Sequence, residues 1–124
     1  MSSADTYIAV VDDEGPVRTM LRRVLHLADF EVVTFESGED FLSSLESRVP
    51  ACVILDVHLA RLSGLDVQSR IRATHGRIPV IFITASADPA LDAVVTQADG
   101  VALLRKPFFS SELIDAVSDA LLRK

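Results

Sequence analysis

Acidic residues directly follow two short apolar runs of this chain. The run "YIAVV" precedes Asp12 and Asp13, and the run "CVIL" precedes Asp56. Such runs are typical of buried strands, and an unpaired carboxylate is expensive to bury. Carboxylates gathered at one place would repel each other by about 4 kcal/mol per pair at 4 Å and an effective dielectric of 20. A hard divalent cation such as Mg²⁺, which prefers oxygen ligands, would relieve that repulsion.

Two further apolar runs also end beside side chains of useful chemistry. Thr84 follows "IPVIFI" and offers a hydroxyl donor, and Lys106 follows "VALLR" and offers a movable cation. With Asp56 they would suit an aspartyl nucleophile that attacks phosphorus. Each residue alone has a plainer interpretation, as a helix cap, a turn hydroxyl or a solvated loop residue. Their joint occurrence at strand ends favours a single site.

The elements that must position these residues follow from the hydrophobic period. Short apolar runs alternate with amphipathic segments of helical period. We predict strands at 7–11, 31–35, 51–55, 78–83 and 101–105, and helices at 14–28, 37–47, 63–75, 88–98 and 110–122. This alternation predicts an α/β fold with a doubly wound, five-stranded parallel sheet and five helices. We expect the strand order 2-1-3-4-5, which is one of the two common solutions for such a sheet. In that order the four strands that are followed by Asp12, Asp56, Thr84 and Lys106 are neighbours.

Composition restricts the class of protein. The length of 124 residues predicts a single domain over 1–124. The formal charge of -6 argues against direct nucleic-acid binding by this domain. The single Cys52 lies in an apolar run, which predicts a core thiol in a reducing compartment. The start "MSSADT" lacks the basic segment of a signal peptide, and no run approaches the roughly 20 apolar residues of a membrane helix. We therefore expect a cytoplasmic protein with no membrane contact.

Four motifs in register carry a resemblance to a known family. "VVDDE", "VILDVHL…SGLDV", "VIFITA" and "LLRKPF" together resemble the receiver domain of bacterial two-component response regulators, most closely receivers of nitrogen-fixation and nitrate-response regulators. The resemblance covers nearly the whole chain. It implies a phosphorelay protein in which Asp56 accepts a phosphoryl group from a histidine kinase or phosphotransfer protein. It implies that the protein is not an enzyme, apart from its intrinsic self-phosphorylation and autodephosphorylation activity.

The resemblance also implies a metal site and its ligands. Asp12 and Asp13 would hold Mg²⁺, with Asp13 in the more direct contact. Asp56 and the backbone carbonyl of His58 would complete the metal shell. The chain is therefore expected to require Mg²⁺ as its cofactor.

The remaining roles that the resemblance implies concern the phosphoryl group and the signal. Thr84 would close onto the phosphoryl group as a switch, and Lys106 would pair with it. The Lys106–Pro107 peptide bond is expected to be cis. The ring of His58, together with Ser86, would modulate dephosphorylation. Switching is expected to reshape the face formed by 88–98, 101–105 and 110–122.

Three departures from the family pattern concern the loops and the output face. The loop after Asp56 reads Leu59–Leu62 where the family often has Pro and Gly. Leu103 stands where an aromatic switch residue is usual, so no ring can rotate there. Asp99 and Gly100 replace a frequent Gly-Ala pair, which suggests a shifted turn before the fifth strand.

Other functions stay open beside the phosphoacceptor. A degenerate receiver could act as an unphosphorylated interaction module, which Leu103 and the altered loop would suit. A small aspartyl phosphatase would carry Asp-x-Asp on the first strand, whereas Asp56 follows the third. A flavodoxin-like FMN binder needs a hydroxyl- and Gly-rich loop where "DDEGP" stands. As a receiver, the chain is compatible with a homodimer on activation and with a DNA-binding output domain beyond residue 124.

Overall fold

Five parallel strands form the centre of the protein. The computed structural model describes residues 6–122. The expectation that the opening segment "MSSADT" is not a signal peptide therefore concerns residues that lie largely outside the described part. The strands are β1 (Ile8–Val11), β2 (Val32–Phe35), β3 (Cys52–Asp56), β4 (Val80–Thr84) and β5 (Ala102–Arg105). They lie in the order β2-β1-β3-β4-β5, which confirms the predicted topology.

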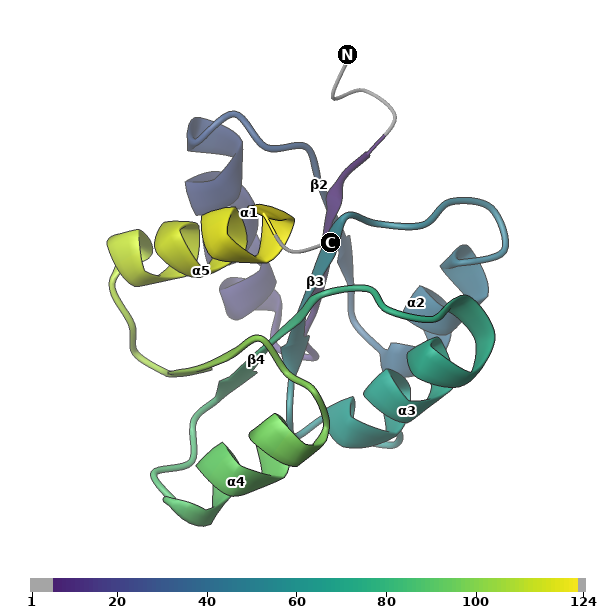
Figure 1. Cartoon of the computed structure of the whole chain (residues 1–124). Helices are drawn as coiled ribbons and strands as arrows, with labels where there is room; N and C mark the ends of the chain where they lie inside the picture. The colour runs from purple at the N-terminus through teal and green to yellow at the C-terminus, as the bar shows by residue number, and fades with distance from the viewer. Residues whose placement is uncertain (1–5, 123–124) are drawn as a thin grey trace.

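Helices cover both faces of this sheet (Figure 1). They are α1 (Gly15–Leu27), α2 (Gly38–Ser44), α3 (Gly64–His75), α4 (Ala90–Gln97) and α5 (Ser110–Leu122). Helices α1 and α5 pack on one face, and α2, α3 and α4 on the other. None of the described helices is long and apolar enough to cross a membrane.

Strand residues alternate between two hydrophobic clusters because successive side chains leave a strand on opposite faces. Ile8 and Val10 contribute to the cluster under α1 and α5, while Ala9 and Val11 contribute to the cluster under α2, α3 and α4. All residues of β1, β3 and β4 are buried, as a covered parallel sheet requires. Cys52 is fully buried in β3, and burial raises the pKa of its thiol to about 12. The predicted core thiol is confirmed.

Helices α2 and α4 depart most from their predicted bounds, whereas α1 and α3 are shorter by only one or two residues. Helix α2 ends at Ser44 rather than at residue 47, because the chain tightens there: the Leu45 N–H donates to the Leu42 carbonyl and Glu46 to Ser43. Helix α4 begins at Ala90 rather than at residue 88, with Pro89 as its N-cap residue.

Serine side chains cap the starts of α2 and α3. The Ser37 hydroxyl accepts from the Asp40 N–H, and the Ser63 hydroxyl accepts from the Asp66 N–H, each at 3.1 Å. The cap at Ser63 fixes the start of α3 close to the end of β3. There Gly64 lies so near the Asp56 carbonyl oxygen that an added Cβ would collide with it.

Candidate functional site

Asp56 ends the central strand β3 with its carboxylate held from two sides. The residue is only 5% exposed. One carboxylate oxygen, Oδ1, accepts from the His58 backbone N–H at 2.8 Å. The other, Oδ2, accepts from Lys106 Nζ at 3.0 Å. The strand thus ends on a charge because that charge is paired, and its oxygens are oriented by the backbone on one side and an ammonium on the other.

Asp12, at the end of β1, is held in the same way. It is fully buried; its Oδ1 accepts from the Glu14 backbone N–H at 2.9 Å and its Oδ2 from Lys106 Nζ at 2.9 Å. Burial and the nearby charge of Asp56 raise the pKa of Asp12, although the bonds from Glu14 and Lys106 act in the opposite direction. Asp12 therefore loses its proton less readily in the folded protein than a free aspartate does.

Lys106 bridges the acidic side chains. Besides Asp12 and Asp56, its Nζ donates to Glu14 Oε1 at 3.2 Å. Burial alone would lower the pKa of Lys106, but the hydrogen bonds and charges of Asp12 and Asp56 outweigh burial and raise it. The ammonium is therefore charged at neutral pH. The peptide bond between Lys106 and Pro107 is cis, as predicted.

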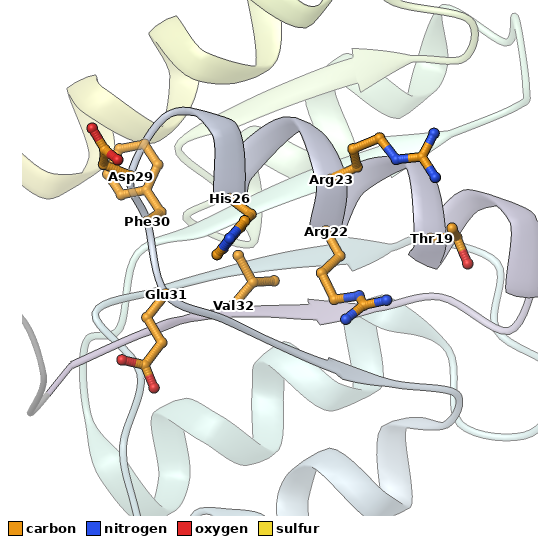
Figure 2. Close-up of a pocket in the computed structure, with 8 residues that line it drawn as sticks. All are labelled: Thr19, Arg22, Arg23, His26, Asp29, Phe30, Glu31 and Val32. Atoms are coloured by element: carbon orange, nitrogen blue, oxygen red, sulfur yellow. The ribbon is translucent and has the colours of Figure 1, made fainter.

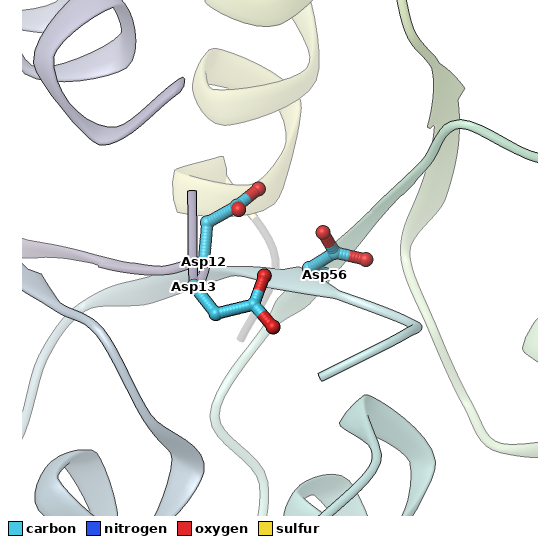
Figure 3. A group of neighbouring side chains, drawn as sticks. All are labelled: Asp12, Asp13 and Asp56. Carbon is cyan, nitrogen blue, oxygen red and sulfur yellow. The ribbon is translucent and has the colours of Figure 1, made fainter. Parts of the chain in front are cut away.

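Asp13 completes an acidic cluster that fits a divalent cation. Ligand oxygens of Asp12, Asp13 and Asp56 all lie within 4.8 Å of one another, and Figure 3 shows the three carboxylates around a common space. Asp13 is exposed, and its carboxylate has no hydrogen bond or ion pair within residues 6–122. Three carboxylates balanced by a single Lys106 leave an excess of negative charge. This all-oxygen donor set is what Mg²⁺ prefers.

Thr84 lies at the end of β4 and is joined to Lys106 through the backbone. It is fully buried, and its carbonyl accepts from the Lys106 N–H at 2.7 Å. Its hydroxyl oxygen accepts from the Ser86 N–H at 3.0 Å, which leaves the hydroxyl hydrogen available. The structure gives no hydrogen bond between this hydroxyl and the acidic cluster.

The structure thus brings four of the predicted side chains into direct contact or close approach: Asp12, Asp13, Asp56 and Lys106. His58 is exposed, and in the described part of the chain only its backbone N–H contacts this cluster, through Asp56. No described contact links its ring to Asp56.

Sequence reasoning missed two charged residues beside the site. Glu14 shares Lys106 with the two aspartates, and Arg18 donates from Nη1 to the Asp12 carbonyl at 2.8 Å. The third consecutive acid after "VV" was the available signal for Glu14. No pattern pointed to Arg18, because its role depends on how α1 leaves the end of β1.

A third missed residue is Arg105, which precedes Lys106. Its Nη2 donates to the Asp88 carbonyl at 2.8 Å and its Nε to the Ser86 carbonyl at 3.3 Å. Its guanidinium also approaches the Asp92 carboxylate of α4, at 3.4 Å. Arg105 therefore fastens β5 to the loop between Thr84 and α4.

Comparison with known proteins agrees with this geometry. The family model described as the response regulator receiver domain matches residues 8–118. A transcriptional regulatory protein of Thauera aromatica, TdiR, is 37% identical over 114 residues, which cover 92% of this chain and 50% of TdiR. The chain thus spans about half the length of these curated relatives, TdiR and the nodulation protein W of Bradyrhizobium diazoefficiens.

Solved structures give the same result. A response regulator receiver protein from Burkholderia phymatum is 38% identical with a TM-score of 0.84, and 94% of each chain is covered. The response regulator TrrA from Thermotoga maritima, solved in complex with Mg²⁺-BeF, is 30% identical with a TM-score of 0.84. That comparison covers 94% of this chain and 99% of TrrA.

Proposed function

The chain belongs to the family of response regulator receiver domains of two-component systems, and from this we propose that it accepts a phosphoryl group from a histidine kinase on Asp56. We further propose that residues 1–124 form a single receiver domain. Receiver domains act in signalling rather than as metabolic enzymes. The phosphoryl group here is a transient mark on the protein.

The observation that supports the proposal is the held carboxylate of Asp56. The His58 N–H and Lys106 Nζ fix the direction of its oxygens, at 2.8 and 3.0 Å. In the proposed step an Asp56 oxygen attacks phosphorus, and the bond from phosphorus to the donor imidazole nitrogen breaks. The electron pair stays on that nitrogen. Lys106 then pairs with charge on the transferred group, which offsets the loss of its bond to Asp56.

Receiver domains bind Mg²⁺ at an acidic pocket, and the cluster described above fits that ion. Asp12, Asp13 and Asp56, with the His58 carbonyl, are the proposed ligands. When bound, Mg²⁺ would supply positive charge against the carboxylates and the phosphoryl oxygens. The protein's own contribution is to hold Asp12 and Asp56 in place through backbone N–H groups before the ion arrives.

Signal output is proposed to begin at Thr84. Its hydroxyl hydrogen can donate to a phosphoryl oxygen, and the loop that follows it is tied by Arg105 to β5. Movement of Thr84 would therefore reach α4 and β5 together. We propose that the face of α4, β5 and α5 reports the phosphorylated state, and that the His58 ring modulates loss of the phosphoryl group.

The partners extend beyond this domain. TdiR is named as a transcriptional regulatory protein and is about twice as long as the matched segment. We propose a DNA-binding output domain beyond residue 124, homodimer formation on activation, and action in the cytoplasm, where the reduced Cys52 is stable. This domain itself, with its charge of -6, is not expected to touch nucleic acid.

The proposal is tested by loading the protein with acetyl phosphate. With Mg²⁺ present, intact-mass measurement should show one added phosphate, and chelation of the metal should abolish it. Asp56→Asn should stay unmodified. Asp119→Asn, on the exposed surface of α5, is the matched control and should load normally. Normal loading of Asp56→Asn would reject Asp56 as acceptor, and no loading of the wild type would favour a degenerate receiver.

A further inference from the structure

A groove runs between α1 and the outer edge of β2. Two adjoining hollows of about 730 and 440 Å³ share Thr19, Arg22 and Val32. Figure 2 shows the first, with Arg22, Arg23 and His26 on α1 and Val32 on β2. We call these two hollows together the α1–β2 groove. It follows β2 from Val32 to Thr34.

The helical wall of the groove is cationic. Helix α1 contains no Asp or Glu, although the chain as a whole has a formal charge of -6. Arg22 and Arg23 are exposed, and within residues 6–122 neither makes a hydrogen bond or an ion pair. Their charge is therefore available to an anionic partner.

The other wall offers unpaired backbone groups. The Ile8 N–H donates to the Glu31 carbonyl at 2.8 Å, and the Asp12 N–H donates to the Phe35 carbonyl at 3.1 Å. In a parallel ladder alternate residues face the neighbouring strand, so Val32 and Thr34 turn their N–H and C=O groups away from β1. No other strand pairs with β2 in the described part of the sheet. Such an edge is a template for another strand.

We propose that the α1–β2 groove binds an extended acidic segment of a partner protein, which pairs with the free edge of β2 as a sixth strand. In an extended segment every second side chain lies on the same face. Acidic residues at alternate positions would thus reach Arg22 and Arg23, while the backbone bonds Val32 and Thr34. Affinity comes from the main chain and selectivity from the side chains, as in other edge-strand recognition.

The sequence around the groove favours a polypeptide over a polyanion. Asp29 and Glu31 also line the first hollow, and they would repel a nucleic acid or a phosphate chain, which is negatively charged along its whole length. A peptide can instead carry its acidic side chains only where they face Arg22 and Arg23. The opposite edge strand, β5, is a poorer candidate for an acidic strand. It lies beside α5, which carries Glu112, Asp115 and Asp119 and no basic residue.

The first hollow of the groove is separate from the phosphoacceptor site, whereas the second, lined by Gly15 and Arg18, extends toward Asp12. Val32 begins β2, whereas Asp12 and Asp56 lie at the carboxyl ends of their strands, so the first hollow lies toward the opposite end of the sheet. A segment bound there leaves Asp56 open. The inference therefore does not depend on phosphorylation and would survive its failure.

The test uses a short capped peptide that alternates Glu and Val, added to the ¹⁵N-labelled chain. Binding should perturb amide signals of α1 and β2 and slow hydrogen exchange at Val32 and Thr34, because edge pairing covers those N–H groups. The variant that combines Arg22→Glu with Arg23→Glu should bind about tenfold more weakly or worse. Arg70→Glu, an exposed reversal on α3, is the control and should bind like the wild type.

Two further ligands separate the proposed mode from simple charge attraction. The same peptide with N-methyl groups at alternate residues keeps its charge but cannot pair along an edge, and it should lose binding. A peptide that alternates Lys and Val should not bind. Equal binding of the N-methylated peptide or of inorganic phosphate, or an unchanged affinity of the double variant, would overturn the inference. Thermal unfolding of each variant verifies that it is folded.

Discussion

At the scale of single residues, Asp12 carries an electrostatic cost that can be measured. Its folded-state pKa is raised by burial and by Asp56. Its unfolded pKa should be near 3.9. Because the folded state binds the proton more tightly, the contribution of Asp12 to the free energy of unfolding decreases as pH rises between these two values. Above both pKa values the full decrease in the free energy of unfolding is present.

We therefore expect Asp12→Asn to be more stable than the wild type at pH 7 without divalent ions, and the difference to shrink toward pH 4. Urea unfolding of both proteins across this range measures it. Asp119→Asn serves as a surface control. A variant less stable than the wild type at pH 7 would mean that the bonds of Asp12 to Lys106 and Glu14 outweigh the repulsion.

Asp13 and Asp12 should contribute unequally to metal affinity. Asp13 is exposed and unpaired among the described residues, so its whole charge is available to an ion, whereas Asp12 is already shared by Lys106 and a backbone N–H. Mg²⁺ titration by calorimetry should show a severalfold larger loss for Asp13→Asn than for Asp12→Asn. The reverse order, in folded variants, would exchange the two roles.

The site was largely predictable because strand ends can be read from a sequence. Apolar runs placed Asp56, Thr84 and Lys106 at the edge of one sheet, and the structure puts Lys106 against Asp56. The role of Arg18 was not predictable, because its guanidinium reaches the Asp12 carbonyl only through the particular angle of α1. Hydrophobic periodicity says which face of a helix is buried but not where a long polar side chain ends.

At the scale of elements, the segment from Thr84 to α4 is the expected transmitter. Thr84→Ala should accept phosphate from acetyl phosphate, since Asp56 and Lys106 are unchanged. It should not reproduce the activated shifts of amide signals in α4, β5 and α5, because it lacks the hydroxyl that we propose closes onto the phosphoryl group. Comparing beryllofluoride-loaded wild type and variant by NMR decides this. Identical shifts would exclude the hydroxyl as switch.

Arg105 should stabilise that same segment. Arg105→Gln removes the bonds to the Ser86 and Asp88 carbonyls and the approach to Asp92. We expect a loss of about 1 to 2 kcal/mol in unfolding free energy and faster hydrogen exchange in the segment from Ser86 to Asp92. Arg70→Gln on α3 is the matched control. Unchanged exchange would show that Arg105 does not fasten the loop.

Element boundaries were less predictable than element types. Ser63 fixed the start of α3 through a hydroxyl that sequence alone reveals. The end of α2 depended instead on backbone turns after Ser44, and residues there have no side-chain signature that distinguishes a helical turn from a tighter one. Leu103 is partly buried against the core, as an ordinary core leucine would be.

At the scale of the whole molecule, strict alternation of strands and helices predicted a parallel sheet with right-handed crossovers, for which the observed order 2-1-3-4-5 is one of the two common solutions. What the pattern could not show is how charge is distributed over the finished surface. Helix α1 is cationic and α5 acidic, and both cover the same face of the sheet. A chain with a net charge of -6 therefore presents surfaces of both signs.

Chemical labelling of the single thiol, Cys52, can report how often the sheet opens. Cys52 begins the central strand β3, has no exposed surface and has a pKa of about 12, so a thiol reagent at neutral pH can modify it only when the sheet opens. Its labelling rate without denaturant should therefore equal the rate calculated from global unfolding, using the unfolding rate or the equilibrium constant obtained from urea unfolding. Ligands that bind only the folded state, such as Mg²⁺ with beryllofluoride, should slow labelling in proportion to their occupancy. Labelling as fast as in the unfolded chain would mean that β3 opens locally.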